Sequence, residues 1–264
     1  MTPDRTPSGA ALWLHAGWVG AVCGLASGLL GVGGAIIMVP LLVAVLKLPQ
    51  HHAQGTSLAV TVFTAAAALV GYYEAGHLDW LRAGLLIVGG VLGAPAGARA
   101  GQGHPAHLMR RWFGILMIVV AIRLFLTQLP EGHWVPVTGA VGFAALALLG
   151  FGVGFLSGFF GVGGGVVLIP ALVLLTGTPQ HAAQGVSLLF IVPTTIVGSI
   201  THARLGNVVR RVVLPVALVS MLFAFLAAHL AAALPGTTLR YAFGVLLFVV
   251  GSRLVLASPP AAKH

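Results

Sequence analysis

The sequence predicts an all-α polytopic membrane protein made of two inverted repeats, each of about five helical passes. Of its 264 residues, 58% are hydrophobic and only 6% are charged, whereas about 25% of the residues in a soluble domain are charged. Several apolar runs reach the roughly 20 residues that a helix needs to cross a bilayer. The segment Gly28–Pro40 (GLLGVGGAIIMVP) returns later as Gly158–Pro170 (GFFGVGGGVVLIP). Composition, run length and repetition together indicate this fold class.

The repetition covers most of the chain and keeps one register. It runs without an insertion or deletion from Gly20, which matches Gly150, to Leu124, which matches Leu254. Chance does not preserve a register over about a hundred residues, so the pattern indicates an internal repeat. We therefore expect a first transmembrane repeat at 11–128 and a second at 141–257, joined by a linker near 127–137. Because the segment that begins at Gly20 has an internal counterpart, we expect it to belong to the fold and not to a cleaved signal peptide.

Each half contains four apolar blocks, and the first block of each half is too long for one helix. The blocks cover 11–47, 53–73, 81–100 and 109–127, and then 141–176, 183–202, 212–233 and 240–257. A helix over 11–47 would be about 55 Å long, against a hydrocarbon core of about 30 Å. We divide this block into a helix to about Leu30, a turn at Gly31–Gly34 and a shorter helix to about Leu46. Whether a broken block spans twice or forms a re-entrant hairpin is left open, which gives about eight to ten transmembrane segments.

The basic residues favour inversion of the second half. With five passes per half, one side of the membrane holds Arg5, Lys47, Arg99, Arg110, Arg111, Arg204, Arg210, Arg211, Arg253 and Lys263, and the other holds Arg82, Arg123 and Arg240. With four passes per half, the same 13 basic residues would divide eight against five, which is a weaker asymmetry than ten against three. Cytoplasmic loops are enriched in Lys and Arg. We therefore expect an inverted arrangement in the bacterial inner membrane, with both termini in the cytoplasm.

The GVGG turns are the first candidate site. They contribute Gly31, Gly33 and Gly34 in the first half and Gly161, Gly163 and Gly164 in the second. Interrupted apolar segments at matching places in two halves indicate a transporter's binding site. The helix after each turn presents free N–H groups and a positive dipole end, which favour an anion. Close helix packing is the alternative, and we prefer it for the small-xxx-small pairs Gly24/Gly28 and Gly154/Gly158.

The second candidate site is the repeated stretch PQHxAQGxSL, at 49–58 and 179–188. It places polar side chains on one helical face of each half, namely Gln54, Ser57, Gln184 and Ser187. Their amides and hydroxyls can donate hydrogen bonds to an oxyanion, but hydrogen bonding between membrane helices explains them equally well. For His51 and His181, which we expect near the membrane interface, we prefer a helix-capping role.

The charged residues exclude other functions. The acidic residues are Asp4, Glu74, Asp79 and Glu131, and all fall in predicted tails or loops. An enzyme using acid–base chemistry would lack its carboxylates, and a cation would lack a counter-charge. Arg123 and Arg253 lie late in apolar blocks, where an ionisable residue suggests function, but both are close enough to a helix end to snorkel. The net charge of +9 is scattered, so we expect no nucleic-acid partner.

At these motifs the chain resembles the sulfite exporter TauE/SafE family, also called the sulfonate uptake permease family. The likeness rests on GLLGVGGAIIMVPLL and GFFGVGGGVVLIPAL, each followed by PQHxAQGxSL, and covers nearly the whole chain. The resemblance implies a multi-span carrier for small sulfur-containing anions such as sulfite, sulfonates or sulfoacetate. It implies no direction, because members are assigned to both uptake and export. The halves differ at Ala35/Gly165, His52/Ala182 and His77/Asn207, through substrate tuning or drift.

We therefore expect a secondary anion transporter that works by alternating access and is surrounded by membrane lipid. No cofactor and no metal is expected, since Cys23 is the only cysteine. The coupling ion, a proton or sodium, and homodimer formation are left open. One alternative is a membrane enzyme or scaffold without transport. Another is a histidine-based metal permease, but the 11 histidines are scattered, mostly in loops.

Overall fold

The computed structural model describes residues 9–126 and 139–256, which form ten α-helices. These are α1 (Ala10–Leu30), α2 (Ala35–Ala44), α3 (Gln50–Glu74), α4 (Trp80–Gly101), α5 (Ala106–Leu126), α6 (Gly139–Phe160), α7 (Gly165–Thr176), α8 (Gln180–Arg204), α9 (Arg210–Ala232) and α10 (Gly236–Leu256). The predicted linker near 127–137 and the tail Ser258–His264 lie outside the described residues. Each predicted apolar block contains helix, and the two long blocks each contain a pair.

The predicted break in each long block is confirmed. α1 ends at Leu30 and α2 begins at Ala35, while α6 ends at Phe160 and α7 begins at Gly165. With 10 and 12 residues, α2 and α7 are about 15 and 18 Å long, far short of a hydrocarbon core of about 30 Å. Both are therefore too short to cross a membrane alone.

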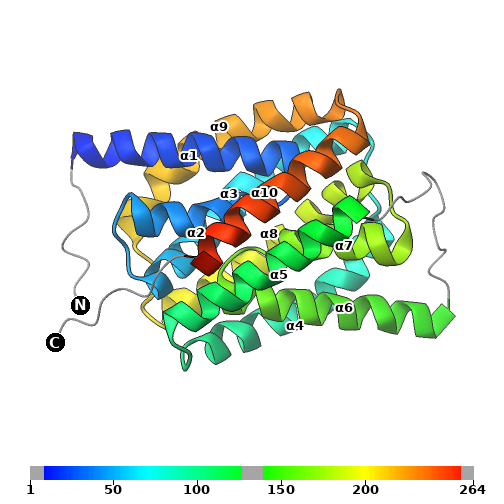
Figure 1. The fold of residues 1–264 in the computed structure, drawn as a ribbon, viewed down its shortest axis with the longest axis horizontal. Helices are drawn as coiled ribbons and strands as arrows, with labels where there is room; N and C mark the ends of the chain where they lie inside the picture. The colour runs from blue at the N-terminus through cyan, green and yellow to red at the C-terminus, as the bar shows by residue number, and fades with distance from the viewer. Residues whose placement is uncertain (1–8, 127–138, 257–264) are drawn as a thin grey trace.

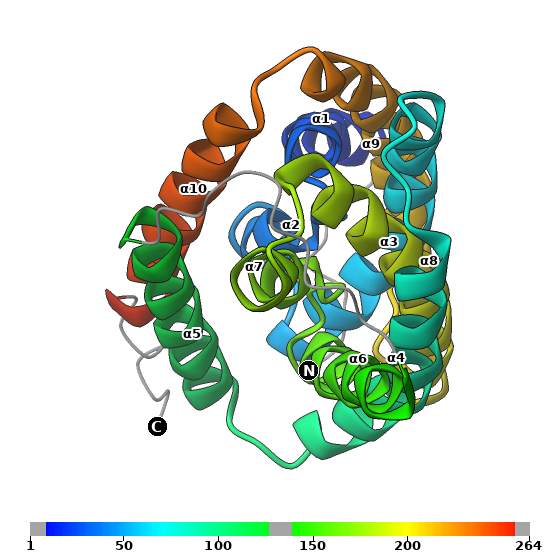
Figure 2. The ribbon, with the colours of Figure 1, turned by 90° about the vertical axis from the view of Figure 1, so that its right-hand side faces the viewer.

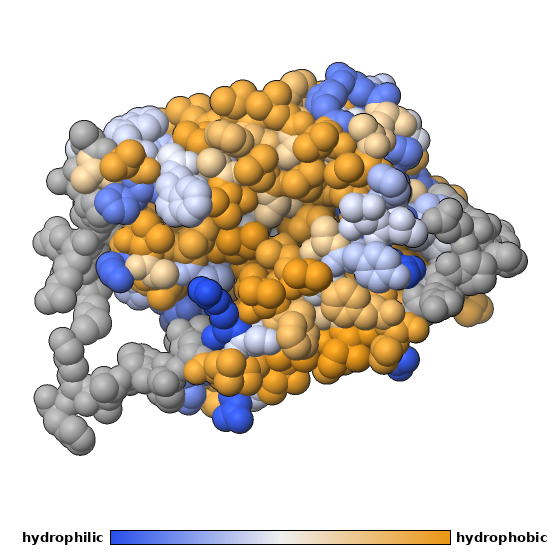
Figure 3. Space-filling view, turned by 45° about the horizontal axis from the view of Figure 1, so that its top comes forward, coloured by the Kyte–Doolittle hydropathy of each residue, from blue (hydrophilic) through white to orange (hydrophobic). Residues whose placement is uncertain are grey.

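Long apolar helices make this a multi-pass membrane protein. Within the described ranges, seven helices are long and apolar enough to cross a membrane: α1, α3, α4, α6, α8, α9 and α10. α5 has 21 residues but carries three arginines, at 110, 111 and 123. In the view of Figure 3, apolar side chains cover most of the middle of the surface, and hydrophilic side chains gather mainly toward its two ends.

Two pairs of corresponding helices run in opposite directions. Figure 1 shows α1 running from left to right and α6 from right to left, and the same reversal relates α5 to α10. Seen from the end in Figure 2, α2 and α7 lie in the middle of the molecule. α5 and α10 lie together on one side of them, and the remaining helices lie on the other sides. The broken segments therefore occupy the interior.

The halves are held together by an exchange of partners. α1 packs along α9 of the second half, and α6 packs along α4 of the first. Glycines permit the close approach: a Cβ atom on Gly24 would lie 2.5 Å from the carbonyl oxygen of Ser220, and Gly154 faces Gly90 in the same way. Gly28 and Gly158 continue these two contacts. This agrees with the packing interpretation of the small-xxx-small pairs.

Candidate functional site

Both GVGG turns have a backbone that only glycine adopts readily. Gly31, Gly33 and Gly34 have φ values of 68°, 72° and 75°. The equivalent glycines of the second turn, Gly161, Gly163 and Gly164, have φ values of 70°, 77° and 84°. A Cβ atom would strain these left-handed positions. The sequence therefore forces each helix to stop at this point and a new one to start in another direction.

The two turns meet at the centre of the molecule. A Cβ atom on Gly33 would lie 2.8 Å from Cγ2 of Thr61, and one on Gly163 would lie 3.4 Å from the same atom. Both glycines also face Ile191, which is the counterpart of Thr61 in the other half. A Cβ atom on Gly165 would lie 2.9 Å from Cα of Val32, within the first turn.

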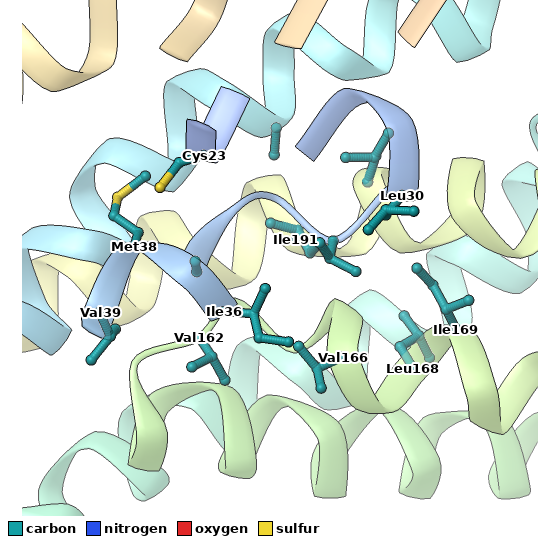
Figure 4. Packing of buried hydrophobic residues seen from close by; sticks show 14 of the residues in the cluster. Cys23, Leu30, Ile36, Met38, Val39, Val162, Val166, Leu168, Ile169 and Ile191 are labelled. Atoms are coloured by element: carbon teal, nitrogen blue, oxygen red, sulfur yellow. The ribbon is translucent and has the colours of Figure 1, made fainter. Parts of the chain in front are cut away.

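The first turns of α2 and α7 lie close to each other. Figure 4 shows Ile36 of α2 beside Val162 and Val166, with Ile191 close to the first GVGG turn. Within the described ranges, no acceptor is found for the N–H groups of Ala35 and Gly165, which begin α2 and α7. Unpaired N–H groups and the aligned peptide dipoles make each such end electropositive. Two positively poled ends thus converge in one buried region.

Each turn packs on the glutamine of the opposite half. A Cβ atom on Gly31 would lie 2.6 Å from Cβ of Gln184, and one on Gly161 would lie 2.5 Å from Cβ of Gln54. The hydroxyl of Ser187 would lie 2.8 Å from a Cβ atom on Gly165. The structure therefore places both predicted glutamines beside the turns and Ser187 beside the start of α7.

Several polar atoms around the turns are buried without a hydrogen-bond partner. Among the described residues these are Oε1 of Gln54 and the hydroxyls of Thr61, Ser157 and Ser187, whose side chains lie within 4 Å of a Cβ position on Gly33 or on the glycines within 161–165. The hydroxyls of Ser27 and Ser57 are also buried without a partner. All of these side chains are at most 1% exposed. Leaving a buried polar group unpaired costs about 1–3 kcal/mol, and unpaired groups in a native structure call for an explanation. The hydroxyls could donate to an anion that binds between the turns, whereas Oε1 of Gln54 is an acceptor, so the Gln54 amide would donate from its Nε2.

Gln184 differs from Gln54, because its amide is already bonded. The hydroxyl of Tyr72 donates to Oε1 of Gln184 at 3.1 Å and lies 3.1 Å from the carbonyl oxygen of Gly28. The Gln184 amide nitrogen donates to the carbonyl oxygen of Leu29 at 3.3 Å. In the other half His202 replaces Tyr72, and its Nε2 lies 3.1 Å from the carbonyl oxygen of Gly158. No hydrogen bond joins His202 to Gln54 within the described ranges.

Two residues of this region are missing from the sequence-based set. Thr61 lies against both turns, and Tyr72 holds Gln184. The set was built from identical pairs of the repeat, whereas Thr61 pairs with Ile191 and Tyr72 pairs with His202. The sequence signal that could have identified them is a threonine or tyrosine in an otherwise apolar helix whose counterpart in the other half is a different residue.

The predicted helix-capping role is found for His181, though at a helix other than its own, and is not found for His51. The N-caps of α3 and α8 are Pro49 and Pro179, and neither helix has a side-chain cap. Nε2 of His181 instead lies 3.1 Å from the carbonyl oxygen of Leu234 and 3.2 Å from that of Ala231. These oxygens lie at the end of α9, so His181 caps another helix and not its own. Nδ1 of His51 has no partner among the described residues.

The described residues contain no group of three or more His, Cys, Asp or Glu side chains arranged to hold a metal ion. The acidic side chains that the structure describes, Asp79 and Glu74, lie at helix ends. Asp79 caps α4 by accepting from the N–H of Arg82 at 3.0 Å, and it also pairs with the Arg82 guanidinium at 3.1 Å. Glu74 pairs with His229 at 2.8 Å. The polar groups between the turns are therefore glycine backbone, amides and hydroxyls, set among apolar side chains such as Ile191, and no carboxylate is among the residues named above.

Comparisons with known proteins place the chain in a family. The profile of the family described as Sulfite exporter TauE/SafE matches residues 16–254. The chain is 29% identical over 216 residues to the probable membrane transporter protein YunE of Bacillus subtilis, covering 72% of this chain and 78% of YunE. It is 33% identical over 190 residues to a probable membrane transporter protein of Xylella fastidiosa strain 9a5c, covering 70% and 72% of the two chains.

A further relative matches over a greater length. The probable membrane transporter protein YdhB of Bacillus subtilis is 28% identical over 237 residues, which cover 88% of this chain and 96% of YdhB. No solved structure matches the chain significantly. The profile match spans both GVGG turns, both PQHxAQGxSL stretches and nearly every described helix. The chain therefore belongs to the sulfite exporter TauE/SafE family of membrane transporters.

Proposed function

We propose that this protein is a secondary transporter that moves small sulfur-containing anions, of the sulfite, sulfonate or sulfoacetate type, across the inner membrane. One observation carries the proposal: the N-terminal ends of α2 and α7 converge where Gly33 and Gly163 face Thr61 and Ile191. The family description points to the same class of substrate.

The chemistry of the site suits a small oxyanion. Free N–H groups at two helix starts, with hydroxyls of Ser57, Thr61 and Ser187 and the amide of Gln54, would each donate one hydrogen bond to a sulfur-bound oxygen. Hydrogen bonds to an ionised acceptor are about twice as strong as neutral ones. A cation would find positive poles instead of a counter-charge.

We further propose that the two halves are inverted repeats that rock against each other around this site. The antiparallel course of α1 and α6 supports this view (Figure 1), as does the exchange of helices between the halves. In this proposal both termini are cytoplasmic, as the distribution of basic residues favours. Alternating access by such repeats needs no large change within either half.

A flux measurement tests the proposed function. Purified protein is reconstituted into proteoliposomes that are loaded with sulfite, ethanesulfonate or sulfoacetate, and efflux is followed with and without proton and sodium gradients. We expect flux of at least one of these anions above that of protein-free vesicles. The absence of flux for all three under every gradient, with correctly inserted protein, would leave a scaffold or enzyme as the remaining alternative.

A further inference from the structure

A cavity of about 450 Å³ lies between α2 and α10. Its walls are mainly apolar and come from residues 37–44 of α2 and 249–254 of α10. Two polar side chains join them, Gln50 at the start of α3 and Arg253 near the end of α10. A mostly apolar cavity of about 300–1,000 Å³ with a few converging polar groups is typical of a small-molecule site.

A second cavity extends this one toward the turns. It measures about 20 Å³ and shares Val39, Pro40, Gln50 and Leu254 with the first. Its other walls include Gln54 and Val162, which belongs to the second GVGG turn. A space of this size holds about one water molecule. The two cavities thus adjoin, and the smaller one, a narrow neck, reaches Gln54 and the second GVGG turn.

Three polar groups line these two cavities in sequence. Arg253 and Gln50 line the outer cavity, Gln50 also lines the neck, and Gln54 stands one helical turn further along α3. Arg253 is exposed, and its guanidinium has no hydrogen bond or ion pair among the described residues. Oε1 of Gln54 is buried and unpaired. A lone positive charge is therefore followed by two amides.

The equivalent surface of the other half is more closed. Gln50 is half-buried, but its counterpart Gln180 is only 7% exposed, and both polar atoms of its amide are buried without a partner. Leu254 is half-buried, whereas its counterpart Leu124 is 1% exposed. Pro40 is likewise half-buried, whereas its counterpart Pro170 is buried. At these three pairs the residue that lines the cavity is thus less buried than its counterpart on α5, α7 or α8.

We infer that the α2–α10 cavity is the access route of the anion on one side of the membrane, and that Arg253 is its first binding residue. The structure is then a state open on the side of Arg253 and closed on the side of Arg123, with the neck around Gln54 still to widen. This inference rests on the proposed function, in which Arg253 faces the cytoplasm. In the opposite state, open on the side of Arg123, Gln180 and Arg123 would be exposed and Gln50 would be buried.

Cysteine labelling tests the route without any transported substrate. In a Cys23→Ala background, Val39→Cys and its counterpart Ile169→Cys are treated with two methanethiosulfonate reagents of similar size, one bearing a sulfonate and one a quaternary ammonium group. We expect Val39→Cys to react and Ile169→Cys to stay unreactive. Val250→Cys on α10, which also lines the cavity, serves as a second probe if the first variant folds poorly.

The charge of the reagent then tests Arg253. Since a local positive charge raises the local concentration of anions, we expect the sulfonate reagent to react at Val39→Cys about ten times faster than the cationic one. Adding Arg253→Gln should remove this preference, and adding Arg123→Gln should leave it intact. In proteoliposomes Arg253→Gln should raise KM for the transported anion several-fold with less effect on kcat.

Two results would overturn the inference. If Val39→Cys and Val250→Cys react only with a lipid-soluble maleimide, the cavity is a lipid-facing crevice and not a water-filled route. If the preference for the anionic reagent survives Arg253→Gln, this arginine is not the attracting charge. Both results are independent of flux, so a protein that transports none of the tested anions can still pass or fail this test.

Discussion

At the residue scale, the two glutamines of the repeat have different surroundings. Gln184 has both ends of its amide bonded, to Tyr72 and to the carbonyl oxygen of Leu29. Gln54 packs on Gly161 in the same way, but its Oε1 is buried without a partner. The difference arises because His202 stands where the first half has Tyr72. One amide is therefore engaged in structure, whereas the other has no hydrogen bond among the described residues, and its Nε2 can donate to an anion.

This difference predicts unequal effects of one substitution. Gln54→Leu should weaken anion binding by about 1–3 kcal/mol, because a buried hydrogen bond to a charge is lost. Gln184→Leu should mainly lower stability, because it leaves the Tyr72 hydroxyl without one of its acceptors. The measurements are anion affinity by calorimetry and the melting temperature in detergent. Equal losses of affinity in both variants, at unchanged melting temperature, would contradict the assignment.

The sequence could identify the pair of glutamines but not the difference between them. Identity across the repeat marks Gln54 and Gln184 as equivalent, and the glycines that force φ above zero mark the turns. Which half supplies the partner of each turn depends on how the helices pack, and no local pattern encodes that. Gln54 lies beside Gly161, and Gln184 lies beside Gly31. Such contacts across the halves are absent from any single motif.

At the element scale, the loop between α3 and α4 packs on the start of α8. A Cβ atom on Gly185 would come close to the carbonyl oxygen of His77. The ring of His77 stacks on that of His181, with 4.9 Å between centroids. The starts of α3 and α8 could be predicted from the sequence, because Pro49 and Pro179 directly precede these helices. The stacking of His77 on His181 could not be predicted in this way, because it depends on how the two halves pack.

The stacked histidines predict a pH effect on stability. Burial, and then the neighbouring charge of His181, lower the pKa of His77 from its usual 6.5. His77 in the unfolded chain then binds a proton more readily than His77 in the folded protein. The free energy of unfolding should therefore fall as the pH decreases from 6.5 toward the lowered pKa of His77. Melting curves in detergent across this range should show the decrease, and it should be smaller in His77→Asn, which copies the Asn207 of the second half. An equally large decrease in that variant would exclude His77 as its source.

At the scale of the whole molecule, the inverted arrangement predicts where equivalent loops lie. Ala75 and Leu205 occupy the same position in the two halves, at the ends of α3 and α8. In a Cys23→Ala background, Ala75→Cys should be labelled from the periplasm and Leu205→Cys from the cytoplasm by a membrane-impermeant maleimide. Cys23 itself is fully buried, so its removal should not change the pattern. Labelling of both positions from one side would restore a parallel arrangement with four passes per half.

The exchange of helices between the halves has a consequence for biosynthesis. α1 emerges from the ribosome early, but its packing partner α9 begins only at Arg210. At roughly 5–20 residues per second, α1 waits about 10–40 seconds with its glycine stripe uncovered. During this interval the first half is exposed to chaperones and proteases of the membrane as an incomplete bundle. Neither half should therefore accumulate when expressed alone, whereas two separately encoded halves should rescue each other when they are made together.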